Sequence, residues 1–192
     1  MAYVLFISEN KIKDSTAIGG NVDMEFMLPY IKVAQKKYIE TKLGTDLFEA
    51  LQTKITAGSL AGAYQTLVDD YIQDALVHFA FYECLPFLRF KVSNGNIYSK
   101  TSETGTALST DEAQHLREEI RNTAEFYVQR LIDYITNNTS SFPEYSTSSG
   151  ADISPDKDAY YSWMNLERNR QKRGLTLDDF LTPDLSWRNT IR

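Results

Sequence analysis

The sequence predicts an all-α fold, namely a helical bundle of about four helices, with a small β-hairpin between the two long helices and an extended C-terminal arm. Three observations support this fold class. Apolar residues recur at steps of three and four in long segments, residues that favour turns separate those segments, and 42% of the 192 residues are hydrophobic. The chain is therefore large and apolar enough to bury one core.

The first expected helix spans residues 23–42. Pro29 suits its opening turn, where the missing backbone N–H costs nothing, and Gly44 suits its end. Before this helix, residues 3–7 are too short and too poorly flanked for a signal peptide, and they predict a short strand or a docking segment. The apolar face of the helix consists of Ile31, Ala34, Tyr38 and Ile39.

A short helix over residues 45–58 and a long helix over residues 63–85 are expected next. Thr45 or Asp46 can cap the short helix, and Pro86 is expected to end the long one because proline disrupts a helix interior. The long helix carries a wide apolar stripe: Tyr64, Leu67, Tyr71, Ala75, Phe79 and Tyr82.

Two short runs, residues 90–92 and 97–98, flank an Asn-Gly pair and predict a β-hairpin with a tight turn. A loop rich in Ser, Thr and Gly follows over residues 99–108. The fourth helix is expected to begin after Ser109, which forms a capping-box pattern with Glu112, and to end near residue 136. Its expected buried face consists of Leu116, Ile120, Thr123, Tyr127, Leu131 and Tyr134.

The composition changes beyond the fourth helix and divides the chain. Residues 1–138 are expected to form the helical domain, residues 139–150 a polar linker, and residues 151–192 a docking arm. The arm has too few apolar residues for a core of its own, so its aromatic residues favour contact with another surface.

Charge, cysteine content and hydropathy exclude several classes of protein. The formal net charge of -6 argues against tight DNA binding or attachment to anionic membranes, and the acidic excess lies in residues 1–150. A single cysteine, Cys84, excludes an internal disulfide and any multi-cysteine metal site. No apolar stretch reaches the length of a membrane helix, so no membrane association is expected.

Motifs for catalysis are sparse, and neither an enzyme nor a cofactor is expected. The chain has no phosphate-binding glycine loop and no nucleophile elbow. Glu112 and His115, with His78, could belong to a metal-binding helical bundle, but the required Glu-x-x-His pattern occurs only once. Capping by Glu112 and packing of His78 are the more ordinary explanations.

The basic run over residues 168–173 allows three interpretations. It could form the solvated end of a helix, dock on an acidic partner, or bind nucleic acid as part of a regulatory protein.

The order, lengths and apolar spacing of the helices resemble the head-tail connector, or adaptor, proteins of tailed bacteriophages, especially those of crAss-like and related phages of Bacteroidota. The residues that carry the resemblance are Leu28, Pro29, Tyr30, Ile31, Ala34, Gln35, Tyr38, Ile39, Leu43, Gly44, Leu47, Phe48 and Leu51. It covers roughly residues 20–138, and the last 40 or so residues depart from small adaptors.

This resemblance implies a structural virion protein, assembled in the cytoplasm of the bacterial host. It would form a homo-oligomeric ring, typically a dodecamer, beneath the portal protein, and would bind a downstream tail or ring protein. The ring would extend the DNA channel and enclose double-stranded DNA without reading its sequence. The alternatives are the metal-binding bundle and the DNA-binding regulatory protein.

The resemblance also implies candidate contact residues. Contacts with the portal or a neighbouring subunit are expected at Tyr160, Trp163, Met164, Leu166, Arg168, Arg170, Lys172, Arg173, Phe180 and Trp187. A loop facing the channel or the tail is expected to present Lys91, Asn94, Gly95, Asn96 and Lys100.

Overall fold

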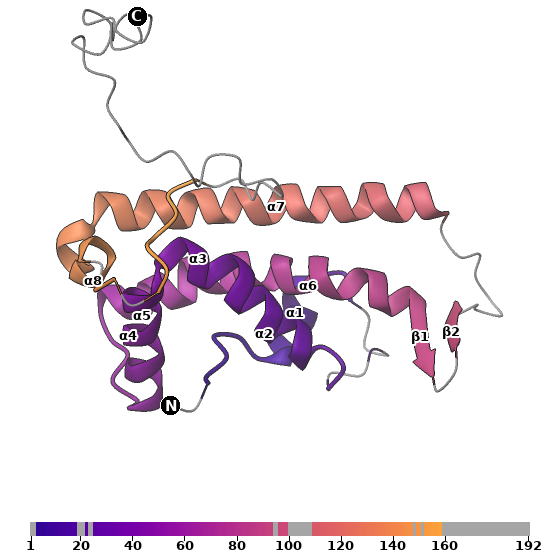
Figure 1. Cartoon of the computed structure of the whole chain (residues 1–192), viewed down its shortest axis with the longest axis horizontal. Helices are drawn as coiled ribbons and strands as arrows, with labels where there is room; N and C mark the ends of the chain where they lie inside the picture. The colour runs from indigo at the N-terminus through magenta and orange to yellow at the C-terminus, as the bar shows by residue number, and fades with distance from the viewer. Residues whose placement is uncertain are drawn as a thin grey trace, which may run out of the picture. The chain divides into compact units, whose positions relative to one another are not determined.

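The computed structural model describes residues 3–18, 22, 25–93, 96–99, 109–147, 149–150 and 152–158 (Figure 1). The chain divides into two compact units, Met1–Tyr161 and Ser162–Arg192. All described residues belong to the first unit. That unit is mostly helical, so the predicted all-α class is confirmed.

The elements follow one another in the order expected from the sequence, with additions at both ends. They are α1 (Glu9–Ser15), α2 (Leu28–Ala34), η1 (Gln35–Ile39), α3 (Glu40–Leu43), α4 (Thr45–Thr56), α5 (Ala63–Thr66), η2 (Leu67–Ile72), α6 (Gln73–Arg89), β1 (Phe90–Ser93), β2 (Asn96–Ser99), α7 (Thr110–Asn137), η3 (Thr139–Ser141) and α8 (Pro143–Ser146). The segments η1 and η2 are π-helical, and η3 is a 3-10 turn.

Two of the expected helices contain a π-helical segment. The first expected helix runs without a break through α2, η1 and α3, and the third runs through α5, η2 and α6. Pro29 lies in the opening turn of α2 as predicted, and Gly44 separates α3 from α4. Neither π segment was predicted, because apolar spacing at three and four residues does not distinguish the two kinds of turn.

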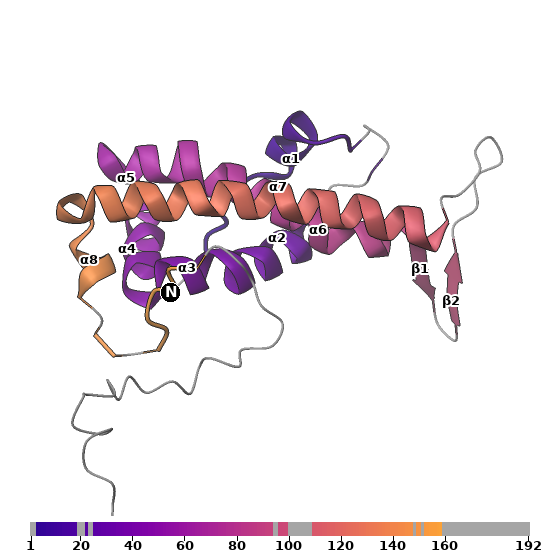
Figure 2. The same cartoon turned by 90° about the horizontal axis from the view of Figure 1, so that it is seen from above.

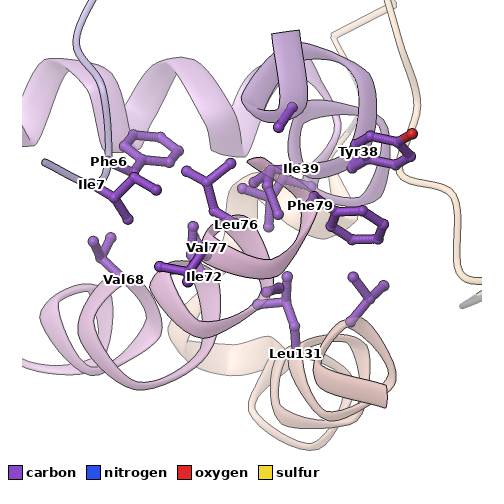
Figure 3. Close-up of a cluster of buried hydrophobic side chains, with 14 of the residues drawn as sticks. Phe6, Ile7, Tyr38, Ile39, Val68, Ile72, Leu76, Val77, Phe79 and Leu131 are labelled. Carbon is purple, nitrogen blue, oxygen red and sulfur yellow. The ribbon is translucent and has the colours of Figure 1, made fainter. Parts of the chain in front are cut away.

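The helix α6 lies at the centre of the unit. It contacts α1, α2 and α7, and Ile72, Leu76 and Phe79 are almost fully buried along η2 and α6. Figure 3 shows these side chains between Phe6 and Ile7 of the N-terminal segment and Leu131 of α7. The rings of Tyr38 and Phe79 stack with centroids 4.0 Å apart, which ties η1 to α6.

The helix α7 runs along α6 in both views (Figures 1 and 2). Ser109 accepts a hydrogen bond from the Glu112 backbone N–H, and the Glu112 side chain accepts one from the Ser109 N–H, so the predicted capping box is confirmed.

The buried face of α7 is rotated from the one expected. Leu116 and Thr123 are exposed, and the buried apolar residues are Ile120, Ala124, Val128, Leu131, Ile132 and Ile135. Ile120 and Leu131 are buried as expected, and Tyr127 and Tyr134 pack against the core while partly exposed.

The helix α6 continues beyond Pro86, contrary to the expected end at residue 85. Pro86 lies inside α6, which ends at Arg89 and leads directly into β1. Packing of Leu88 against the core supports the final turn despite the missing hydrogen bond. The strands β1 and β2 pair antiparallel, Phe90 with Ser99 and Ser93 with Asn96.

The compact unit extends past residue 138, where the sequence suggested a polar linker. Phe142 is fully buried and packs edge-on against Tyr64, with centroids 5.3 Å apart, while Tyr145 is 5% exposed. The Tyr64 hydroxyl also donates to Glu144. Two aromatic side chains in a polar context therefore complete the core.

Residues 149–158 bind the connection between α3 and α4. The Thr45 N–H donates to the Ile153 carbonyl, and the Asp156 N–H donates to the Thr41 carbonyl, both at 3.0 Å. The buried Lys42 ammonium lies 2.8 Å from the Asp156 carboxylate and also donates to the Asp158 carbonyl. This segment is therefore fixed by backbone and charged contacts together.

Candidate interaction surfaces

Most residues predicted to contact partners lie outside the described residues. This holds for all ten between Tyr160 and Trp187, and for Asn94, Gly95 and Lys100. The backbones of Lys91 and Asn96 lie in β1 and β2. The surfaces considered next come from other parts of the chain.

Glutamine side chains hold the N-terminal segment against the bundle. The Val4 N–H donates to Gln52 Oε1 at 2.7 Å, and the Phe6 N–H donates to Gln35 Oε1 at 2.9 Å. The Val4 carbonyl accepts from Gln35 Nε2 and Gln52 Nε2, and the Phe6 carbonyl accepts from Gln73 Nε2. The prediction that residues 3–7 form a docking segment is confirmed, with amides in place of a partner strand.

An exposed row of aromatic rings lies on one side of the bundle. The Tyr30 ring lies 5.3 Å from that of Phe26 and 5.1 Å from that of Phe87, centroid to centroid. Phe26 and Phe87 are 39% and 45% exposed, and Val33, one turn after Tyr30, is 46% exposed. We call the surface formed by Phe26, Pro29, Tyr30, Val33 and Phe87 the α2 face.

Lysines border the α2 face. Lys32 and Lys36 are exposed, and Lys37 is partly exposed. Lys36 pairs with the buried Glu40 and Lys37 with the nearly buried Glu83, so the carboxylates lie below the surface and the ammonium groups above it. Glu25, next to Phe26, is an exposed acidic residue at the same border, so that Lys32, Lys36 and Lys37 outnumber it there.

A second apolar surface lies on α7. Phe126 is 61% exposed and Leu116 is 42% exposed, although phenylalanine and leucine are usually buried. Glu112, Glu119 and Asp133 are exposed on the same outward arc of the helix, with Arg130 as the exposed base. We call this surface, from Glu112 to Asp133, the α7 face.

The two faces lie on different sides of α6. In the view of Figure 1, α7 runs above α6 and α2 lies in front of it, and α6 contacts both helices. Within the described part of the chain, every exposed large hydrophobic side chain belongs to one of these faces. Three of these side chains belong to the α2 face, and the other two, Leu116 and Phe126, lie ten residues apart on α7.

The residues of the possible metal site are explained by packing and capping. The His78 ring stacks on Tyr127 with centroids 5.2 Å apart, and burial lowers the pKa of His78. Hydrogen bonds from Ser109 lower the pKa of Glu112, and His115 is exposed. Among the described residues, no three His, Cys, Asp or Glu side chains are grouped so that they could bind a metal ion.

Cys84 is buried within the core, and burial raises the pKa of its thiol to about 11. A thiol with such a pKa is almost entirely protonated at neutral pH and is a poor nucleophile. None of the helices in the described ranges is sufficiently long and apolar to span a bilayer.

Comparison with known proteins gives one match. No curated protein and no solved structure matches the chain significantly. Residues 39–155 match a family described as "Family of unknown function (DUF6712)". The match covers more than half of the chain, from the end of η1 through α7 to the segment that binds the α3–α4 connection. The chain therefore belongs to the DUF6712 family.

Proposed function

We propose that this protein is a structural subunit of the head-tail connector of a tailed bacteriophage. In this role it forms a ring beneath the portal, extends the DNA channel and joins the portal to the tail. The proposal begins from the resemblance in helix order and spacing described above. The structural observation that best supports it is the concentration of exposed apolar side chains on two separate faces.

A subunit of a ring must contact two neighbours through different surfaces. The α2 face and the α7 face lie on different sides of α6, which is the arrangement that such contacts require. Neighbouring aromatic rings exposed on a folded domain, such as Phe26 and Phe87 on either side of Tyr30, often mark contacts with other proteins.

The net charge also fits a protein that encloses DNA without holding it. With a formal net charge of -6, the chain lacks the excess of Lys and Arg that neutralises phosphates in DNA-binding proteins. An acidic channel wall would let a duplex move through instead of retaining it.

Electron microscopy of the purified protein mixed with a portal protein from the same genome tests this function. The expected result is a ring of additional density on one face of the portal, coaxial with its channel. An unrelated helical protein of similar mass and charge serves as the control. If the portal shows no added density and the protein forms no ring under any condition, the connector role is wrong.

A further inference from the structure

We propose that copies of this chain bind one another head to tail, with the α2 face of one copy against the α7 face of the next. The occupant of each face is therefore a second copy of the same chain. This inference deepens the proposed connector function, because it names the surfaces from which a ring would be built.

The first argument concerns the apolar side chains. Phe126, at 61% exposure, is the most exposed of the large apolar side chains in the described residues. The α2 face offers rings of matching character, since Tyr30 lies between Phe26 and Phe87 at centroid distances near 5 Å. Burial of an aromatic side chain among other rings is the usual centre of a protein interface.

The second argument is complementarity of charge. On the continuous helix formed by α2, η1 and α3, Lys32 and Lys36 are exposed and Lys37 is partly exposed, whereas the one glutamate, Glu40, is buried. On α7, the carboxylates of Asp111, Glu112, Glu118, Glu119 and Asp133 are exposed, together with one exposed arginine, Arg130. The rim of one face therefore attracts the rim of the other.

The same charges disfavour symmetric pairing. Two α7 faces would bring carboxylates together, and two α2 faces would bring lysines together, each at an energetic penalty. Contact between unlike faces leaves one free face at each end of a pair, so that further copies add until a ring closes or a filament grows.

Two single substitutions test the pairing. Val33→Asp places a carboxylate in the α2 face, opposite an acidic partner surface, and Phe126→Lys places an ammonium group in the α7 face, opposite a basic one. We expect the dissociation constant for self-association to rise by a factor of about ten or more in each variant. Sedimentation velocity at increasing concentration measures this change. Gln65→Lys, on the exposed side of α5, is the control and should associate normally.

Mixing the two variants distinguishes unlike from like pairing. Phe126→Lys retains an intact α2 face and Val33→Asp an intact α7 face, so an equimolar mixture should regain association. If Val33→Asp alone still associates fully, the contact joins two α7 faces. If Phe126→Lys alone does so, it joins two α2 faces. Either result overturns the proposal, as does an unchanged chain that stays monomeric at every concentration.

A second pair of variants guards against misfolding, which circular dichroism would report. Lys32→Glu and Glu119→Lys reverse exposed charges at the rims, remove no buried side chain, and should each weaken association. Combining both in one chain should restore it.

Self-association of the expected kind without portal binding would refute the connector role alone. Portal binding with association insensitive to all four substitutions would refute the pairing alone.

Discussion

Gln35 is a fully buried amide whose oxygen and nitrogen both bind the backbone of the N-terminal segment. Replacement by leucine preserves the approximate size of the side chain. It leaves the Phe6 N–H without its acceptor and removes one of the two hydrogen bonds to the Val4 carbonyl. We expect Gln35→Leu to lower the free energy of unfolding by about 2–4 kcal/mol, measured by urea denaturation. Gln65→Leu, at an exposed position, should change it little. Equal losses in both variants would contradict the role assigned to Gln35.

Asp46 provides a prediction for acid pH. The Ser149 side chain and backbone N–H donate to its carboxylate at 2.6 Å, and these bonds lower the pKa of Asp46. Because the pKa is lower in the folded state, the stabilisation is present above the unfolded-state pKa of about 3.9 and is lost as the pH falls through the folded-state value.

Ser149→Ala removes the larger of the two contributions. We expect the pKa of Asp46 to rise toward its ordinary value, as followed by the NMR shift of its carboxyl carbon during an acid titration. Glu112 provides the internal control, because hydrogen bonds from Ser109 lower its pKa and Ser149 takes no part in them. A Ser149→Ala chain with an unaltered Asp46 titration would show that the bond from the Ser149 hydroxyl is not formed in solution.

At the scale of elements, the turn between α3 and α4 depends on a glycine. Gly44 has φ of 75°, and a Cβ placed there would lie 2.7 Å from the Pro155 ring. Gly58 has a similar φ of 63° with open space around it. Substitution of Gly58 by alanine therefore measures backbone strain alone, whereas the same substitution at Gly44 adds a steric clash.

We expect Gly58→Ala to cost about 1 kcal/mol from strain alone, and Gly44→Ala to cost clearly more. Thermal unfolding of both variants measures the difference. Adding Pro155→Ala to Gly44→Ala should recover part of the loss, because it removes the ring atoms nearest to the new Cβ. Equal melting temperatures for the two alanine variants would mean that residues 149–158 do not bind this turn closely.

The elements that could be predicted from the sequence are those with local signals. Pro29, the Ser109–Glu112 capping box and Gly44 mark helix ends through hydrogen bonds and dihedral angles within a few residues. The π segments, the continuation of α6 beyond Pro86 and the rotated face of α7 depend on packing against distant elements. Such packing overrides the local helix preference of the residues and produces no periodic pattern in the sequence.

At the scale of the whole molecule, two phenylalanines show where local patterns fail. Phe142 follows a polar run but is fully buried, whereas Phe126 lies on a long amphipathic helix but is 61% exposed. We expect Phe142→Ala to lower the free energy of unfolding by about 3–5 kcal/mol. Phe126→Ala should change it by about 0.5 kcal/mol or less.

Chemical denaturation of the two variants makes this comparison with the same substitution in the same chain. Comparable losses would place the boundary of the compact unit near residue 138, as the sequence suggested. A loss confined to Phe142→Ala would establish that the folded unit extends to Phe142 and that the Phe126 side chain does not contribute to its core.

The candidate surfaces could not be predicted from the sequence for a related reason. Phe126 adjoins Tyr127, and a rotation of α7 by one residue would exchange which of the two faces the core. Phe26 and Phe87 are 61 positions apart, and only the packing of α2 on α6 brings both rings to Tyr30. The connector role, by contrast, came from the sequence resemblance and stays a prediction.

The glutamine amides that hold residues 4 and 6 form hydrogen bonds with main-chain atoms, and these bonds do not involve the side chain of Val4. Position 4 is therefore free to diverge during evolution, since almost any residue supplies the same N–H and carbonyl. Proline is the exception at both positions, because it has no N–H to donate. Across homologous chains, we expect variable residues at position 4 to coexist with amides at the positions of Gln35 and Gln52.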